Sequence, residues 1–573
     1  MSEWVWRTAE SLVAGENPDL DLLPVPLGQL LLNRGIKSRP EIDEFLEPAS
    51  AAPNDPFLLK DMDRAVERIY RALRAEEMIA VYGDFDADGL TAAALLYDVL
   101  RSPYLQGHVT WYLPHRTREG YGLNTDAIRS LSEAGASLLI TVDCGIGADA
   151  QVRYAATLGM DVIVTDHHLI SGGVPPAYAV LNARQDGCAY PFKELSGVGM
   201  AYKLAEALLS KLWDASEARS RLVPYLDLVA LGIIADVAPL TGENRALVAA
   251  GLRGIADGGR PGLRALLRSA GWNDRPIDSD CVSYVIAPRL NAAGRMGDAS
   301  TSLKLLLAET DEEAQALAAV LEEANRSRQA ATSAALTAAR LDVASRKEIP
   351  PAIVIAGEYP AGILGLVAGR LAEEFLRPVF VVELGECESR GSGRGVPGFD
   401  VVAALFSCSD MLTRFGGHAQ AGGFSFKTSD LAAITERLER SASAQIGSGR
   451  LSRELMIEGT LRLGDVGHAL YRNLTRLEPH GAGNSRPLFC SRDLFVRDSR
   501  TVGNGHLKLW LADESGTTPA IGFGLANACR QFSGAGMRVD CAYTIARDDR
   551  GANGGYELVL KDLIPSAAAS KVL

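Results

Sequence analysis

Three acidic clusters in the first third of the chain each directly follow a short apolar run. They are Asp84, Asp86 and Asp88 after residues 79–82, Asp143 after 138–142, and Asp166, His167 and His168 after 162–165. Carboxylates gathered in one place repel one another, and a bound divalent cation is the usual way to relieve that repulsion. Carboxylate oxygens with one or two imidazoles favour Mg²⁺ or Mn²⁺, and a pair of such ions can activate water against a phosphoryl group. These residues therefore indicate a hydrolase of phosphodiesters or pyrophosphates.

Each cluster alone has a simpler explanation. The turn 84–89 could be a solvated loop, and the pair His167 and His168 could cap a helix. Three clusters at predicted strand ends nevertheless favour one site, because the carboxyl ends of parallel strands lie along one edge of a sheet. Asp236 is a fourth candidate, since it ends the apolar run 228–235, where a carboxylate is costly to bury unless it is paired or metal-bound. Its simpler explanation is a charge at a helix end that reaches solvent.

The elements around these residues predict an α/β fold in several domains. Apolar runs at 78–82, 109–113, 138–142, 162–165 and 178–181 alternate with helical segments, which is typical of a doubly wound parallel sheet. Residues 311–343 contain no Gly or Pro and predict a long connecting helix. Strands and helices alternate again at 353–356, 364–375, 379–382, 422–426 and 430–443. Strand-like runs at 494–497, 506–511, 520–523, 538–544 and 556–560 predict a small β-barrel.

We therefore expect an N-terminal cap (1–75), a catalytic domain (76–310), the connecting helix (311–346), a smaller α/β domain (347–450) and the barrel (451–573). The composition, with 47% hydrophobic and 23% charged residues, fits ordinary globular domains. No apolar stretch suits a signal peptide or a membrane span, so we expect no membrane association and a cytoplasmic location. The eight cysteines show no CxxC spacing, which argues against a thiolate zinc site. The net charge of −13 would by itself argue against a nucleic-acid-binding protein.

Four segments together resemble the DHH phosphoesterase superfamily and, within it, the RecJ family of single-strand-specific 5′→3′ DNA exonucleases. They are residues 83–91, 165–168, 231–237 and 288–295. The resemblance implies two divalent ions, Mn²⁺ or Mg²⁺, held by Asp86, Asp88, Asp143, His167 and Asp236. It gives Asp84 and Asp166 the role of orienting these ligands. It also implies that His168 and Arg289 meet the scissile phosphate, and that Arg116, Tyr121, Asn291 and Arg295 contact the substrate.

Two later regions extend the resemblance. Residues 390–395 and 415–424 are similar to the DHH-associated domain, which implies that Ser392, Arg394, Gly416, Gly417 and His418 grip the nucleotide. We expect the glycine runs to present backbone N–H groups to an anion. Gly395 stands where the family usually has Ser, and residues 359–362 read Tyr-Pro-Ala-Gly in place of Trp-His-Pro-Gly. Residues 477–484 and the strands after them resemble an OB-fold, with Lys508 and Trp510 as candidate nucleic-acid contacts beside Arg472, Arg476 and Arg497.

The resemblance implies an exonuclease that releases mononucleotides from single-stranded DNA in recombination and repair. It also implies a monomer that works near single-strand-binding protein and a RecQ-type helicase. One alternative is another DHH phosphoesterase, acting on oligoribonucleotides, 3′-phosphoadenosine phosphate, cyclic dinucleotides or pyrophosphate; the C-terminal barrel argues against such small substrates. The other is a non-catalytic replication scaffold of the same fold, which would be expected to lose metal ligands that are all present here. A narrow cleft between two lobes would admit one strand and exclude a duplex.

Overall fold

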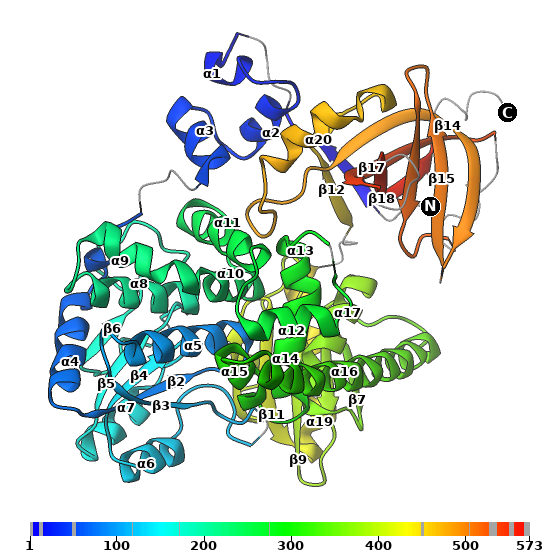
Figure 1. Ribbon diagram of the computed structural model, residues 1–573. Helices are drawn as coiled ribbons and strands as arrows, with labels where there is room; N and C mark the ends of the chain where they lie inside the picture. Colours follow the sequence, from blue (N-terminus) through cyan, green and yellow to red (C-terminus); the bar gives the residue numbers. More distant parts are fainter. Residues whose placement is uncertain are drawn as a thin grey trace. The chain divides into compact units, whose positions relative to one another are not determined.

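The computed structural model describes residues 4–10, 15–48, 53–116, 118–170, 172–273, 275–447, 452–503, 505–526, 536–548 and 555–566 (Figure 1). The chain divides into two compact units. The larger unit comprises Pro53–Ala238 and Leu247–Leu451, and the smaller unit comprises Met1–Ala52, Pro239–Ala246 and Ser452–Leu573. The first residues of the chain therefore pack with its C-terminal domain, a pairing that the sequence does not predict.

The larger unit begins with a five-stranded parallel sheet in the order β3-β2-β4-β5-β6. Its strands are β2 (Met78–Gly83), β3 (His108–Tyr112), β4 (Ala136–Val142), β5 (Asp161–Thr165) and β6 (Ala179–Leu181). Successive residues of β4 and β5 are buried on both faces, which explains why these strands read as continuous apolar runs. The predicted doubly wound parallel sheet is confirmed.

Helices cover both faces of this sheet. Helices α5 (Ala87–Arg101) and α8 (Gly197–Leu209) pack together on one face, while α6 (Thr125–Glu133) and α7 (Asp149–Thr157) pack on the other. Helix α4 (Met62–Arg74) precedes the sheet and packs against β6 and α8. A helical layer follows the sheet, of α9 (Ala215–Leu222), α10 (Leu226–Ala235), α11 (Gly242–Ala256), α12 (Pro261–Ser269), α13 (Ser279–Cys281), a π-helical turn (Val282–Ile286), α14 (Ala287–Met296) and α15 (Ser300–Leu307). This layer places Asp236 and the 288–295 motif beside the carboxyl edge of the sheet.

The predicted connecting helix is α16 (Asp311–Ser345), whose first turn is capped by the Thr310 hydroxyl. It leads into a mixed sheet in the order β10-β11-β9-β8-β7. The strands are β7 (Ile353–Gly357), β8 (Val379–Glu383), β9 (Glu388–Arg394), β10 (Leu412–His418) and β11 (Ala421–Lys427). Helices α17 (Leu364–Phe375), α18 (Val401–Phe406) and α19 (Leu431–Ile446) complete this second lobe.

The glycine runs of the second lobe are strands, where the sequence suggests anion-cradling loops. Gly417 pairs with Gly422 between β10 and β11, so this backbone lies in a ladder. A Cβ at Gly391 would lie 2.3 Å from the Phe424 ring, and one at Gly393 would lie 2.6 Å from the Phe380 ring. These two glycines make room for aromatic side chains of the core, and the anion-binding role expected of the glycine runs stays a prediction.

The smaller unit contains the predicted barrel. Strands β14 (Phe489–Val502), β15 (His506–Ala512), β16 (Thr517–Gly522), β18 (Tyr556–Pro565) and β17 (Arg538–Arg547) follow one another, and pairing of β14 with β17 closes the sheet. A short strand β13 (Gly459–Thr460) joins β14, and β1 (Trp4–Thr8) pairs in parallel with β12 (Arg453–Ile457). Helices α1 (Pro18–Asp21), α2 (Leu27–Asn33), α3 (Arg39–Leu46) and α20 (His468–Thr475) accompany them. In the described ranges, no helix has both the length and the apolar character needed to cross a bilayer.

Candidate metal centre

The first acidic cluster lies where β2 ends and α5 begins. Asp86 caps α5, with Oδ1 accepting hydrogen bonds from the backbone N–H groups of Asp88 and Gly89. Asp88 is buried, and its carboxylate accepts from the Ser196 hydroxyl and from the N–H groups of Gly197 and Val198. This carboxylate therefore sits against the N-terminus of α8, where the helix dipole favours negative charge. The two aspartates are thereby held in fixed positions.

Asp143 follows β4 in a left-handed conformation with φ of 60°. Its backbone N–H donates to the Thr165 carbonyl on the neighbouring strand, and its side chain is buried. A Cβ on Gly197 would lie 2.5 Å from the Asp143 Cβ, so only glycine lets α8 approach this closely. The sharp turn and the close helix hold the Asp143 carboxylate at the edge of the sheet.

The two histidines after β5 differ in their partners. Asp166 Oδ1 accepts hydrogen bonds from the backbone N–H groups of both histidines and lies 2.7 Å from His168 Nδ1. Nε2 of His167 lies 3.1 Å from Asp143 Oδ1 and 3.8 Å from Asp236 Oδ2, in geometries that make no hydrogen bond. Asp166 therefore fixes His168, while His167 points an unpaired nitrogen at two carboxylates.

Asp236 ends α10, and Val237 after it has φ of 59°, an uncommon conformation for a β-branched residue. A Cβ on Gly232 of the same helix would lie 2.5 Å from Asp88 Oδ1, which explains why α10 comes so near the cluster. The structure thus brings Asp236 to the acidic residues of the sheet edge, although it lies far beyond them in the sequence.

These side chains fit a metal centre. Three sets offer ligand atoms within 4.8 Å of one another: Asp84, Asp86 and Asp143; Asp88, His167 and Asp236; and Asp143, His167 and His168. Three buried atoms, Asp84 Oδ1, Asp143 Oδ1 and His167 Nε2, have no hydrogen-bond partner among the residues that the structure describes. Buried polar atoms are almost always satisfied, so orphaned acceptors of this kind point to a cation. The oxygen-rich donor set is positioned for Mn²⁺ or Mg²⁺.

The pKa values of these side chains show the cost of burying several carboxylates close together. Burial, with the charge of Asp86 second, raises the pKa of Asp88 to about 7. Burial, followed by the charges of Asp88 and Asp86, raises the pKa of Asp236 to about 8. Burial and the neighbouring His168 lower the pKa of His167 to about 3, so this imidazole is neutral, as a metal ligand must be. A cation would relieve each of these costs.

His168 behaves in the opposite way. Burial opposes its protonation, but the hydrogen bond to Asp166 and the charges of Asp166, Asp236 and Asp86 together outweigh burial and raise the pKa of His168 to about 9. The Tyr121 hydroxyl lies 3.2 Å from His168 Nδ1, and the ring of His418 stacks on that of His168 at 5.7 Å. His168 is therefore a cationic group beside the candidate ligands Asp84, Asp86, Asp88, Asp143, His167 and Asp236, which are together called the metal cluster below.

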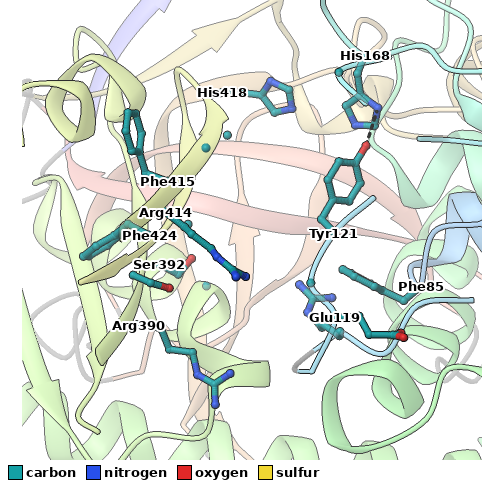
Figure 2. Close-up of a pocket in the computed structure, with 18 of the residues that line it drawn as sticks. Phe85, Glu119, Tyr121, His168, Arg390, Ser392, Arg414, Phe415, His418 and Phe424 are labelled. Carbon is teal, nitrogen blue, oxygen red and sulfur yellow. Dashed lines mark hydrogen bonds between the residues drawn. The ribbon is translucent and has the colours of Figure 1, made fainter. Parts of the chain in front are cut away.

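A cavity of about 1000 Å³ lies between the parallel sheet and the second lobe of the larger unit. Figure 2 shows Phe85, Tyr121 and His168 on one side of it and Ser392, Arg414 and His418 on the other. Of the substrate contacts that the sequence predicts, Arg116, Tyr121, Arg295, Ser392, Arg394, Gly416, Gly417 and His418 line this cavity. Asn291 lies outside it and accepts a hydrogen bond from the backbone N–H of Ala87.

Arg289 occupies a different place from the one the sequence suggests. Its Nε donates to Glu322 Oε2 on α16 at 2.6 Å, and its Nη1 donates to the Val285 carbonyl. It does not line the cavity. The guanidinium forms an ion pair that joins α14 to α16.

Other cavity residues escape the sequence analysis. Arg118, Arg390 and Arg414 line the cavity, and so does Phe85, whose ring lies 4.6 Å from the Arg116 guanidinium. Phe85 lies inside the 83–91 motif, so the sequence alone could have identified it as a cavity residue. Arg390 likewise begins the 390–395 segment that the sequence analysis singles out. Arg118 and Arg414 carry no such signal, because isolated arginines are common on protein surfaces.

On the barrel, β15 alternates buried leucines with His506, Lys508 and Trp510 on the outer face. Lys508 pairs with Glu557 at 2.5 Å, and the Arg500 guanidinium lies 4.7 Å from the Trp510 ring. Phe523 is 60% exposed. The other barrel candidates, Arg472, Arg476 and Arg497, are all exposed. The outer face therefore presents aromatic rings, while the charge of Lys508 is already paired.

Family models match residues 78–233 as the DHH family, N-terminal domain, and residues 457–562 as the RecJ OB domain. The chain is 32% identical over 562 residues to the single-stranded-DNA-specific exonuclease RecJ of Salmonella typhimurium, covering 95% of this chain and 96% of that protein. This chain belongs to the RecJ family. The RecJ of Bacillus subtilis is 34% identical over 525 residues, but the match covers only 65% of its length.

Solved RecJ structures agree with this membership. RecJ of Thermus thermophilus in complex with Mn²⁺ matches with a TM-score of 0.81 and 31% identity, over 98% of this chain and 80% of that one. The Mg²⁺ complex of the same RecJ matches with a TM-score of 0.74. These are the two ions that the sequence predicts.

Proposed function

We propose that this chain is a metal-dependent exonuclease that degrades single-stranded DNA from its 5′ end and releases mononucleotides. One observation carries the proposal: orphaned ligand atoms converge at the sheet edge beside Asp166 and His168, and these two residues line a cavity that guanidinium groups also line. Anionic ligand atoms suit cations, and unpaired guanidiniums suit phosphates. Its RecJ relatives are named for activity on single-stranded DNA.

The proposed metal ligands are Asp86, Asp88, Asp143, His167 and Asp236. Asp84 lies beside Asp86 and Asp143 and would complete one of the two sites. Divalent ions held there would polarise the phosphoryl oxygens and lower the pKa of a water to near neutrality. Asp166 positions His168 through the hydrogen bond at Nδ1.

His168 is proposed to act on the scissile phosphate. Asp166 engages Nδ1, so Nε2 of the protonated ring remains to donate to a phosphate, and His168 lines the cavity. A fixed cation in this position stabilises the charge that builds on the phosphoryl oxygens as the bond to the 3′ oxygen of the first nucleotide breaks. His418, stacked on His168, and the Tyr121 hydroxyl hold the ring from either side.

The 5′ polarity rests on three guanidiniums. Arg116, Arg295 and Arg394 line the cavity, and none of them forms an ion pair with a carboxylate of the described ranges. Burial, then the charges of Arg116 and Arg328, lower the pKa of Arg295 to about 9. Such a concentration of positive charge suits a terminal 5′ phosphate, whose charge exceeds that of a phosphodiester. Ser392, 3.0 Å from Arg394 Nη1, adds a hydroxyl donor, and Gly416, where a Cβ would meet nothing within 4 Å, leaves room for the nucleotide.

The barrel is proposed to hold the single strand through stacking of bases on Trp510 and Phe523, which sequence-tolerant binding requires. Single-strand-binding protein and a RecQ-type helicase as partners, the monomeric state, a cytoplasmic location and a role in recombination and repair complete the proposal. They rest on family resemblance and on the sequence rather than on contacts.

The test uses the full chain and one oligonucleotide labelled at either end, offered as a single strand and as a blunt duplex. We expect mononucleotides from the 5′ end of the single strand in Mn²⁺ or Mg²⁺, slower cutting of the duplex, and no activity in chelator. Asp143→Asn should abolish both activity and calorimetric Mn²⁺ binding. The matched control is Asp126→Asn, a surface carboxylate paired with Arg129. Equal cutting of duplex and single strand, or activity in chelator, would disprove the proposal.

A further inference from the structure

A second cavity, of about 210 Å³, adjoins the metal cluster. Its walls come from the end of α10, the π-helical turn, and helices α14, α16 and α17. Its polar lining consists of Ser283, Asn291, Arg295 and Arg328, and no carboxylate lines it. Arg295 lines both this cavity and the larger one, so the two meet at that guanidinium.

Three side chains of the small cavity, Arg328, Asn291 and Ser283, each keep a donor that has no acceptor in the described part of the chain. Nε and Nη2 of Arg328 donate to Asn325 Oδ1, at 3.3 and 2.8 Å, but Nη1 has no acceptor in the described part of the chain. Asn291 Oδ1 accepts a hydrogen bond from the backbone N–H of Ala87, and its Nδ2 donates to no described residue. The Ser283 hydroxyl likewise makes no side-chain hydrogen bond within the described ranges. Three donors therefore converge on one space.

The charge in this space is also uncompensated. Arg328 forms no ion pair with any carboxylate of the described ranges. Burial, together with the neighbouring charges of Arg289 and Arg370, lowers the pKa of Arg328. A half-buried guanidinium surrounded by other guanidiniums is costly unless an anion joins it. Donors, positive charge and the lack of any lining carboxylate all favour a phosphate group.

The position of the small cavity relates it to the reaction. Two of its lining residues neighbour metal ligands: Val237 follows Asp236 in the chain, and Asn291 Oδ1 accepts a hydrogen bond from the backbone N–H of Ala87, which follows Asp86. The larger cavity touches the cluster through Asp166 and His168. A strand with its terminal nucleotide in the larger cavity and its first phosphodiester at the cluster would continue into the small cavity.

We propose that the small cavity binds the phosphodiester that follows the scissile one, with Arg328 as the charged partner and Ser283 and Asn291 as neutral donors. This inference rests on the proposed exonuclease function and deepens it. Arg328 thereby becomes a specificity residue, which favours polynucleotides over dinucleotides because a dinucleotide has no second phosphodiester to place there.

The experiment compares kcat/KM for 5′-phosphorylated di-, tri- and dodecadeoxynucleotides, using the full chain with Mn²⁺. In Arg328→Ala we expect the trinucleotide-to-dinucleotide ratio to fall roughly ten- to a hundredfold, since a charge-assisted hydrogen bond is lost. Arg328→Lys should recover part of the ratio. The control is Arg340→Ala, which removes an exposed guanidinium from the helix that carries Arg328. Arg340 is paired with Glu374, and its loss should leave the trinucleotide-to-dinucleotide ratio unchanged.

Two further measurements keep the inference falsifiable. The slope of log KM for the dodecanucleotide against log salt should decrease by about 0.7 in Arg328→Ala, the change expected for one lost phosphate contact on a single strand. Ser283→Ala, a smaller change, should shift the ratio in the same direction, and it replaces Arg328→Ala if that variant does not fold.

The outcomes separate this inference from the proposed function. If the wild type degrades single strands and the ratio stays the same in Arg328→Ala, or in Ser283→Ala where that variant replaces it, the subsite is refuted and the exonuclease stands. If the variant instead relieves inhibition by a nucleoside 5′-monophosphate without changing the ratio, the cavity binds the released product, which also overturns the inference. If the wild type degrades no strand, the exonuclease itself fails.

Discussion

Two buried polar centres, one in each unit, differ in how their charges are balanced. In the smaller unit, Arg245 is buried but donates to the carbonyls of Phe45, Leu477, Pro479 and Glu478. In the larger unit, the carboxylates of the metal cluster face one another, with Asp143 Oδ1 and His167 Nε2 left without partners. The first centre needs nothing from outside the chain. The second is complete only with a cation, so the balance of charge separates a structural centre from a functional one.

A nearly buried ion pair in the smaller unit is likewise balanced by groups of the chain itself. Arg34 forms a nearly buried ion pair with Glu458 at 2.7 Å and also donates to Asn484 Oδ1. Asn484 in turn donates to the carbonyls of Leu477 and Pro479. The segment 477–484, which the sequence singles out by resemblance alone, is therefore a structural crossing point that fastens the N-terminal helices to the barrel domain.

The two adjacent histidines differ in the same way: Nε2 of His167 has no hydrogen-bond partner among the described residues, whereas His168 is paired with Asp166. His167→Gln should lose Mn²⁺ binding, and its activity should fall to the level measured in chelator. His168→Gln should keep Mn²⁺ binding but lose about a hundred- to a thousandfold in kcat, the usual cost of removing one group that stabilises transition-state charge. Calorimetry and steady-state kinetics on both variants check this. Equal loss of metal binding in the two would erase the distinction.

Arg245→Met tests the balanced centre. Removing the guanidinium leaves several buried carbonyls without donors, so the free energy of unfolding should fall by about 3 kcal/mol or more. Unfolding in urea, followed by circular dichroism, measures the change. Arg253→Met is the control, because it removes an exposed guanidinium from the same helix. Mn²⁺ binding should survive in the Arg245 variant; its loss would show that the two centres are not independent.

His480 provides a pH-dependent test of the smaller unit. Burial, with the charges of Arg486 and Arg34, lowers the pKa of His480 to about 3, from an ordinary value of 6.5. Below pH 6.5 the unfolded chain takes up a proton that the folded chain refuses, so stability falls as the pH decreases. Between pH 7 and pH 5 this loss should reach about 2 kcal/mol. The difference between wild type and His480→Gln in urea midpoints across this range isolates the effect, and parallel curves would contradict it.

What positions a side chain decides whether its place could be predicted from the sequence. The ligands of the metal cluster could be located because parallel strands all end at one edge, whatever their loops do. The place of Arg289 could not, because its partner Glu322 lies 33 residues away on a helix whose rotation only packing decides. Strands β9 and β10 were missed for a related reason. Their glycine-rich pattern lacks apolar alternation, and Gly391 suits a strand only because the ring of Phe424 fills the space beside it.

Asp236→Asn gives the smallest expected effect and addresses the cost of the unbalanced centre directly. In chelator, the amide removes one of the carboxylates that repel Asp86 and Asp88, so the variant should be more stable than the wild type by about 1 kcal/mol. Saturating Mn²⁺ should reverse this order, because an ion at a hundred times its Kd adds about 2.7 kcal/mol to a protein that binds it. Thermal unfolding with and without Mn²⁺ measures both arms, with the exposed Asp257→Asn as control. A variant less stable than the wild type in chelator would mean that the cluster is balanced within the chain, because only an uncompensated carboxylate can be removed with a gain in stability.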